Sequence, residues 1–280
     1  MKFGLHGINI GPYSSPEIIV EVAQAAEAAG FDSIWTGDHI VLPEQGFSQP
    51  AETPLLDSLI ALTYVAAATR TLKLATGVLI LPQRNPLVLA KEIASLDVLS
   101  GGRVVVGFGV GYLQPEFQAV GASFEERGVR TDEYLEAMQA IWSQEHPAYH
   151  GRFVSFERVQ AYPRPLQHPS PPILIGGTSP AALRRALKYA QGWFGLELDL
   201  EQLQQVLSRL HQLEQEGVRA AGLGPLEISL YQSSPMTPEL VEQLAGFGVH
   251  RLVLSLPMEA SRETALRFIE HTSKTLLQQG

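Results

Sequence analysis

The sequence repeats one unit, in which a short apolar run is followed by a loop and an amphipathic stretch. Eight such runs, rich in valine, isoleucine and leucine, lie at residues 3–8, 33–36, 72–81, 104–108, 173–175, 193–196, 226–230 and 251–254. They lack strict polar alternation, which is typical of strands covered on both faces in a parallel sheet. Eight units at a spacing of roughly 35 residues predict a closed (β/α)8 TIM barrel, with an open doubly wound sheet as the structural alternative.

Five places in the sequence carry the same helix-start signal. A Ser, Thr or Asn side chain accepts a hydrogen bond from an otherwise unpaired amide of the first helical turn, and proline fits the first helical position. The signals are Ser15-Pro16, Thr53-Pro54, Asn85-Pro86, Ser179-Pro180 and Thr237-Pro238. We expect a helix to begin at each of them.

Two segments are longer than ordinary loops. Residues 37–52 follow the second strand, and residues 145–172, with six prolines, separate the fourth helix from the fifth strand. Long insertions in a barrel usually build or cover the substrate face. Because no linker shows a sharp shift in composition, residues 1–280 are predicted to form a single domain.

Composition excludes several classes of function. The chain has 29 acidic against 20 basic residues, a net charge of -9, whereas nucleic-acid binding needs a basic face. Without cysteine there is no disulfide framework, thiolate metal site or cysteine nucleophile. The eight histidines show no metal-ligand spacing, so no metal site is predicted. With no signal peptide and no uninterrupted apolar span, we expect a cytoplasmic protein without membrane partners.

The second strand ends in a pair of residues that can carry acid–base chemistry, Asp38 and His39. A histidine at the carboxyl end of a barrel strand exchanges protons near neutral pH, and a neighbouring aspartate can hold the ring in position. The alternative is that Asp38 caps a loop and His39 is a packed imidazole.

Glycines mark the ends of three further strands. Gly77 interrupts the third strand, where a glycine indicates a bulge or a close approach to the backbone. The fourth strand runs into a glycine-rich stretch, residues 107–111, which as a lone phosphate-loop motif is weak. The fifth ends in Gly176, Gly177 and Thr178 before a helix, which predicts a phosphate seat or an ordinary capped helix start. Arg184 and Arg185 could reach such an anion or lie on a solvated face.

Together these motifs resemble the bacterial luciferase-like superfamily, and most of all its coenzyme F420-dependent oxidoreductases. The resemblance extends from residue 1 to about residue 195. It is carried by residues 1–6, 25–35, 37–39, 75–78, 99–104, 107–111 and 172–177.

The resemblance implies a deazaflavin or flavin bound at the carboxyl ends of the strands. His39 and Asp38 would lie beside the reactive face of the ring, with His39 as proton donor or acceptor. A non-prolyl cis peptide, Gly77–Val78 by analogy, would bulge behind the ring. The cofactor-binding residues would be Thr76, Gly77 and Val78 behind the ring, Gly107, Gly109 and Gly111 along the ring and ribityl chain, and Gly176, Gly177 and Thr178 at the phosphate. Relatives also imply a homodimer formed through the helices next to the second and third strands. The apolar stretch 55–68 would serve for this, and the alternative is a helix packed only on its own barrel.

Two departures from the family bear on the substrate. Relatives that oxidise sugar phosphates carry an acid where this chain has Val110, and a tryptophan that residues 40–44 lack. An apolar or carbonyl/enone-type small molecule is therefore the expected substrate, and Glu116 is expected to be a structural acid at a helix start. We expect hydride transfer between coenzyme F420 and this substrate. The alternatives are an FMN-dependent monooxygenase and a non-catalytic flavin-binding barrel, with a metal-dependent hydrolase last.

Overall fold

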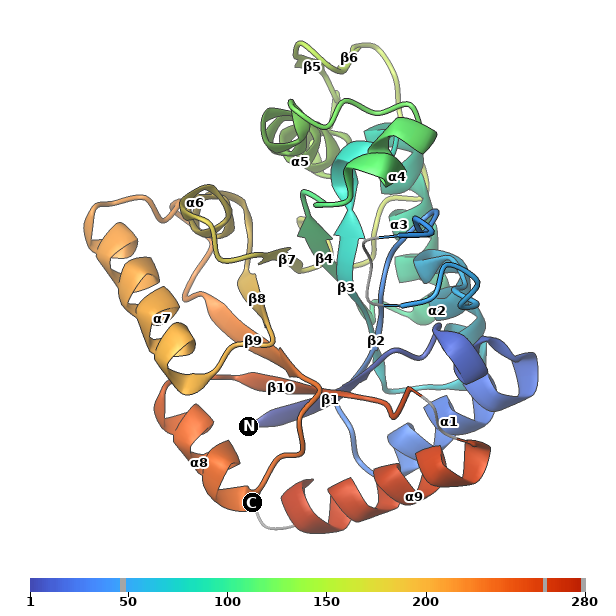
Figure 1. Ribbon diagram of the computed structural model, residues 1–280. Helices are drawn as coiled ribbons and strands as arrows, with labels where there is room; N and C mark the ends of the chain where they lie inside the picture. The colour runs from blue at the N-terminus through green and yellow to red at the C-terminus, as the bar shows by residue number, and fades with distance from the viewer. Residues whose placement is uncertain (46–48, 259–260, 278–280) are drawn as a thin grey trace.

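The computed structural model describes residues 1–45, 49–258 and 261–277, and it confirms the predicted closed barrel. Eight parallel strands follow one another around the barrel in chain order, and the last pairs with the first (Figure 1). The strands are β1 (Lys2–His6), β2 (Ser33–Thr36), β3 (Lys73–Ile80), β4 (Val104–Gly109), β7 (Ile173–Gly176), β8 (Gly192–Leu196), β9 (Glu227–Gln232) and β10 (Arg251–Ser255). Each of the eight predicted apolar runs overlaps one of these strands.

Helices follow the strands and surround the barrel (Figure 1). They are α1 (Pro16–Ala28), α2 (Ser58–Ala68), α3 (Pro86–Ser100), α4 (Gln114–Ala119), α5 (Arg127–Ser143), α6 (Pro180–Tyr189), α7 (Leu200–Gln215), α8 (Pro238–Gly246) and α9 (Arg262–Thr272). The strand–helix repeat is that of a (β/α)8 barrel, with α4 added before α5. Within the described ranges, no helix is both long and apolar enough to cross a membrane.

Four of the five predicted helix starts are confirmed. Each of the four capping side chains accepts a hydrogen bond from a backbone amide of the helix that follows: Ser15, Asn85, Ser179 and Thr237. The prediction at Thr53-Pro54 is wrong, because α2 begins at Ser58. Asp57 caps this helix instead, and its carboxylate accepts hydrogen bonds from the amides of Leu59 and Ile60.

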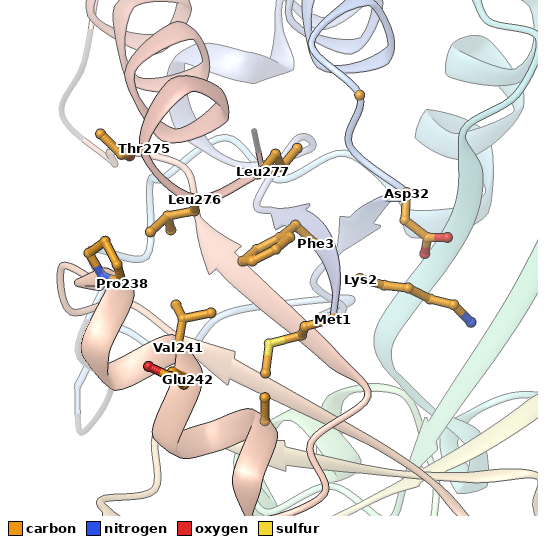
Figure 2. Close-up of a pocket in the computed structure, with 12 residues that line it drawn as sticks. Met1, Lys2, Phe3, Asp32, Pro238, Val241, Glu242, Thr275, Leu276 and Leu277 are labelled. Carbon is orange, nitrogen blue, oxygen red and sulfur yellow. The ribbon is translucent and has the colours of Figure 1, made fainter. Parts of the chain in front are cut away.

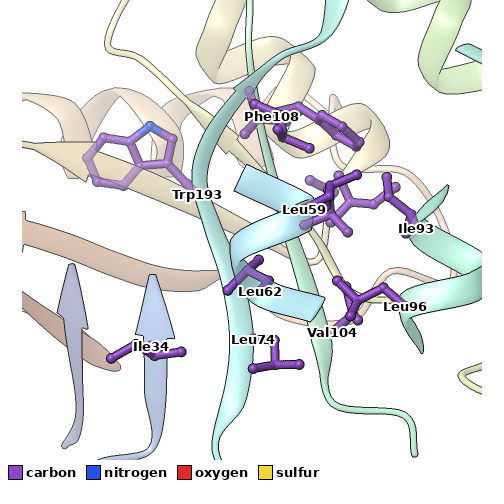
Figure 3. Packing of buried hydrophobic residues seen from close by; sticks show 14 of the residues in the cluster. Ile34, Leu59, Leu62, Leu74, Ile93, Leu96, Val104, Phe108 and Trp193 are labelled. Carbon is purple, nitrogen blue, oxygen red and sulfur yellow. The ribbon is translucent and has the colours of Figure 1, made fainter. Parts of the chain in front are cut away.

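Side chains fill the inside of the barrel. The buried cluster there consists of Trp35, Ala75, Val105, Leu174, Phe194 and Val253, and the rings of Trp35 and Phe194 stack with centroids 5.0 Å apart. A larger apolar layer lies between strands and helices; Figure 3 shows the part where Leu59 and Ile93 gather near Val104. Packing on both faces fixes the strand ends, and therefore the loops that they carry.

The first insertion lies between β2 and α2. Leu55 forms an isolated antiparallel bridge with Ile10, and the Asn9 side chain donates to the carbonyls of Gly37 and Leu56. The insertion is thereby tied to the loop that follows β1. Residues 46–48 of this predicted insertion lie outside the described residues.

The second insertion packs on the outside of the helices. It contains the antiparallel hairpin of β5 (Tyr149–His150) and β6 (Ser155–Phe156). The carboxylate of Glu133 on α5 accepts hydrogen bonds from the amides of residues 152–154 in the hairpin turn. Further along, Gln167 donates to Asp97 on α3 at 2.7 Å and 3.0 Å. The second insertion connects α5 to the start of β7. These hydrogen bonds hold it against α3 and α5.

Candidate active site

A cavity of about 370 Å³ opens at the carboxyl ends of the strands, and we call it the mouth cavity. Residues from the ends of β1, β3, β8 and β9 and from the loops after β2 and β4 line it, among them His6, His39, Val78, Tyr112, Leu196 and Tyr231. A barrel of this type carries its chemistry at this end. The first insertion, residues 37–52, contributes Asp38, His39 and Gln49 to the wall, and Leu55 just after it lines the cavity too. No described residue of 145–172 lines it. The expectation that the second insertion builds this face is therefore wrong.

His39 lies at the mouth cavity and is paired with a buried carboxylate. Its Nδ1 is 3.1 Å from Oε2 of Glu116, and the amide of Ile40 donates to Oε1 of the same carboxylate at 2.6 Å. The Glu116 side chain is 0% exposed. Burial acts to raise the pKa of Glu116, but hydrogen bonds, first from His39 and then from Ile40, outweigh it and hold the pKa below the ordinary 4.5. Glu116 is therefore an ionised acceptor at neutral pH.

The prediction that Asp38 holds the neighbouring imidazole is wrong. Its carboxylate accepts hydrogen bonds from the amide of Ile80 at 2.8 Å and from Nη2 of Arg84 at 2.7 Å. Arg84 also contacts Asp57, the capping residue of α2, at 3.3 Å. Burial raises the pKa of Asp38, opposed by the charge of Arg84. Asp38 thus ties the end of β2 to β3 and to the start of α2.

The third strand bulges at the mouth cavity. The Gly77–Val78 peptide is cis, as the family resemblance implied, and the pairing of β3 with β4 shifts register between Thr76 and Leu79. Gly77 and Val78 line the cavity, as does Gly111 beyond β4.

Several predicted cofactor residues pack behind this bulge. A Cβ added at Gly107, Gly109 or Gly176 would lie 3.0, 2.7 or 3.2 Å from a Val78 methyl group, so these glycines leave room for that side chain. The Thr76 hydroxyl donates to the Gly107 carbonyl at 2.9 Å and is buried. The structure places these four residues around the bulge, and direct cofactor contact by them stays a prediction.

The predicted phosphate seat lies away from the mouth cavity. Thr178 lines a separate hollow of about 330 Å³ between α6 and α7, which Arg209 also lines. Gly177 has a φ of 106°, and its carbonyl accepts a hydrogen bond from the Trp193 indole at 2.8 Å. Of the two arginines considered for an anion, Arg185 is buried against Asp132 on α5 at 2.6 Å.

His6, at the end of β1, is a site residue that the sequence reasoning missed. Its Nε2 lies 3.1 Å from the carbonyl oxygen of Gly77; because a carbonyl only accepts, Nε2 carries the hydrogen. Burial lowers the pKa of His6 to about 4, so the ring is neutral. The edge of Tyr231 packs against it at 4.8 Å between centroids. Its place as the last residue of the first strand was the signal that could have identified it.

The described lining of the mouth cavity lacks the permanently charged cationic side chains. Among the described residues that line it there is no lysine or arginine, and residues 44–52 of the adjoining insertion contain neither in the sequence. A phosphate-bearing substrate would have no cationic partner on these walls.

A larger hollow, of about 640 Å³, lies at the opposite end of the barrel. Figure 2 shows Phe3, Val241 and Leu276 around it, beside the amino end of β1 and between α8 and the C-terminal segment. By volume alone this hollow would be preferred as the active site, but the described residues that line it include no histidine. The mouth cavity has the imidazole groups and lies at the catalytic end of the fold.

A closed β/α barrel with a carboxylate-paired imidazole at its carboxyl-end cavity defines a barrel enzyme. Comparison with known proteins gives the family: the chain belongs to the luciferase-like monooxygenase family, whose sequence model matches residues 3–274. This confirms the resemblance found in the sequence, and it identifies the protein as a luciferase-like oxidoreductase or monooxygenase.

Individual relatives agree with this membership. An uncharacterized protein of Mycobacterium tuberculosis is 30% identical over 84% of this chain and 83% of its own length. An FMNH2-dependent dimethylsulfone monooxygenase of Pseudomonas putida is 31% identical over 62% of this chain and 47% of its own length.

Solved structures share the fold. The monooxygenase RslO1 from Streptomyces bottropensis has a TM-score of 0.83 at 24% identity, over 100% of this chain and 99% of its own. An F420-dependent secondary alcohol dehydrogenase, solved with an F420–acetone adduct, has a TM-score of 0.81 at 16% identity, over 99% and 98% of the two chains.

Proposed function

We propose that the protein transfers a hydride between coenzyme F420 and a small, uncharged carbonyl compound or the corresponding alcohol. The observation that carries this proposal is the imidazole of His39 at the mouth cavity, held by Glu116 at 3.1 Å. Interconversion of a carbonyl and an alcohol needs a group that exchanges one proton at the oxygen, and histidine does so near neutral pH.

The residues at the mouth fit a flat, largely apolar ring. The cavity volume of about 370 Å³ falls within the range of ligand pockets, roughly 300–1,000 Å³. Val78, Tyr112 and Leu196 supply apolar and aromatic wall, and Gly77 and Gly111 leave backbone exposed beside it. We assign the deazaflavin ring of the cofactor to the bulge at Val78, and the phosphate of the cofactor to Gly177 and Thr178 at the start of α6.

The chain's own part in the reaction is binding, orientation and proton exchange. A deazaflavin bound at the mouth supplies or accepts the hydride. His39 gives a proton to the carbonyl oxygen during reduction and takes it from the hydroxyl during oxidation. Fixed groups lower the barrier because they do not need to reorient during the step.

The described walls of the mouth cavity include the acidic residues Asp38 and Glu197 but no lysine or arginine, which supports a substrate without a negative charge. The absence of lysine and arginine from the described lining, together with Val110 in place of an acid, disfavours a sugar phosphate. Leu196 in the cavity lining, and Ile40 and Val41 directly after His39 in the chain, are exposed apolar side chains and favour an apolar molecule.

An FMN-dependent monooxygenase is the second candidate. The relative from Pseudomonas putida is FMNH2-dependent, and the structurally similar RslO1 is a monooxygenase. Reduced FMN reacts with oxygen, whereas reduced deazaflavin resists it, so the choice of cofactor decides between the two candidates.

Separate titrations of the purified protein with FMN and with coenzyme F420 test the proposal. We expect tighter binding of the deazaflavin and, without oxygen, a change in its absorbance that depends on a ketone or alcohol. Preference for FMN with substrate-dependent oxygen consumption would establish the monooxygenase. Tight binding without turnover of any carbonyl or alcohol would refute the proposed reaction.

We also propose that two copies of the chain associate through α2 and α3. Ile60 is 70%, Tyr64 49% and Val88 57% exposed on these neighbouring helices. Large exposed apolar side chains of this kind favour a protein interface. Sedimentation of the wild type as a dimer and of Ile60→Glu as a monomer is expected; a monomeric wild type would contradict the proposal.

A further inference from the structure

The imidazole of His39 is held by a carboxylate that is remote in the sequence. Glu116 lies in the first turn of α4, and its side chain is 0% exposed, against 16% for His39. One carboxylate oxygen is 3.1 Å from Nδ1 of the ring, and the other accepts the Ile40 amide at 2.6 Å. The two hydrogen bonds fix the carboxylate between the ring and the backbone of the same loop.

We infer that Glu116 is the positioning residue of His39: it accepts Nδ1–H and keeps the neutral ring in the tautomer whose Nε2 carries the lone pair. The consequence for turnover rests on the proposed function; the tautomer itself does not.

The argument is one of donors and acceptors. An ionised carboxylate only accepts hydrogen bonds, so the ring nitrogen that faces Glu116 must carry the hydrogen. In a neutral imidazole the other nitrogen, Nε2, is then the base. When Nε2 takes a proton, the imidazolium forms against a carboxylate already in place, which stabilises the charged form.

The neighbouring carboxylate of Asp38 has other partners. Its two oxygens accept hydrogen bonds from the Ile80 amide and from Arg84, at 2.8 and 2.7 Å. Asp38, adjacent in sequence to His39 and buried like Glu116, therefore provides a control carboxylate whose hydrogen bonds go to Ile80 and Arg84.

The direct test is the nitrogen NMR spectrum of the histidine rings in cofactor-free protein, with the His39 signals assigned by their loss in His39→Asn. In spectra recorded at a pH high enough to leave the ring neutral, we expect the hydrogen on Nδ1. A ring protonated on Nε2, or an even mixture of tautomers, would overturn the inference. This reading needs only the wild-type fold and no knowledge of the substrate.

The variant Glu116→Gln sharpens the test. The glutamine oxygen can still accept the Ile40 amide, while its NH2 group then faces Nδ1 and demands the tautomer protonated on Nε2. We expect the His39 signals to switch in this variant and to stay unchanged in Asp38→Asn. An unchanged tautomer in a folded Glu116→Gln protein would contradict the inference.

Kinetics then separate this inference from the proposed function. Loss of the correct tautomer should lower kcat by roughly 10²-fold or more, with no change in the dissociation constant of the deazaflavin, and Glu116→Asp should restore part of it. If the wild type transfers no hydride at all, the proposed function fails while the tautomer measurement still decides the inference. If Glu116→Gln switches tautomer yet keeps full kcat, the positioning role is refuted.

Discussion

The two ends of the barrel both contain a hollow and buried ion pairs, but of different kinds. At the amino end, the Arg251 side chain is 2% exposed and contacts Asp32 at 2.9 Å and also Glu227, near the hollow of about 640 Å³. At the carboxyl end, an imidazole meets Glu116 at a cavity of about 370 Å³. A guanidinium keeps its charge throughout the accessible pH range, whereas an imidazole changes charge near neutrality. A guanidinium pair also lies at the carboxyl end, where Arg84 contacts Asp38 at 2.7 Å. The carboxylate-paired imidazole, and not the size of the hollow, therefore marks the end that reacts.

Removing the imidazole should have the largest effect. We expect His39→Ala to lower kcat by about 10²–10⁴-fold, because the proton at the substrate oxygen loses its partner. Cofactor affinity should stay nearly intact, because groups other than His39 hold the deazaflavin ring. Steady-state rates and a binding titration on the same sample check this. Unchanged turnover would remove His39 from the mechanism.

Removing the guanidinium at the other end should affect stability without affecting chemistry. Arg251→Met leaves two carboxylates without their shared cation and should lower the free energy of unfolding by about 3 kcal/mol. Urea unfolding measures this. The control Lys2→Met removes a cation that is 47% exposed, 3.5 Å from Glu227, and should cost less than about 1 kcal/mol. A loss of kcat in folded Arg251→Met would contradict the assignment of stability to the amino end and of catalysis to the carboxyl end.

Two glycine-to-alanine changes compare the ends at the level of packing. In Gly109→Ala the new Cβ would lie 2.7 Å from a methyl group of Val78, so we expect a cost of about 1–3 kcal/mol and weaker deazaflavin binding as the bulge shifts. Gly246, at the end of α8, has open space around it, and alanine there should stabilise by about 0.5 kcal/mol. Thermal unfolding and cofactor titration measure both variants. Unaltered binding by Gly109→Ala would argue against a ring lodged at Val78.

The last prediction concerns a carboxylate at the amino end, whose effect appears only at low pH. Glu27 accepts hydrogen bonds from the amides of Arg70, Thr71 and Leu72. Burial acts to raise its pKa, but these bonds outweigh it and bring the pKa from 4.5 to about 2. The stability that Glu27 contributes is therefore complete above about pH 4.5 and is lost as the pH falls toward 2. Urea unfolding across this window should show a smaller loss in Glu27→Gln than in wild type; equal losses would refute the assignment.

The sequence predicted the barrel because eight apolar runs and the helix-cap signals are local features. It predicted His39 and the bulge at Val78 from their positions at strand ends and from the family resemblance. It could not predict that Glu116, separated from His39 by α2, β3, α3 and β4, supplies the partner of the ring. Nor could it show that Asp38 is engaged by Arg84. Both pairings depend on how β2, β3 and β4 bring loops together in space, which no local pattern encodes.

Hydrogen–deuterium exchange with and without coenzyme F420 tests the central claim most directly. We predict slower exchange on cofactor addition at residues 37–40, 77–80 and 109–113, which surround the mouth cavity, and no change at residues 1–3 and 238–245 beside the larger hollow. Protection confined to the amino end, or none at the mouth, would contradict a cofactor bound in front of His39.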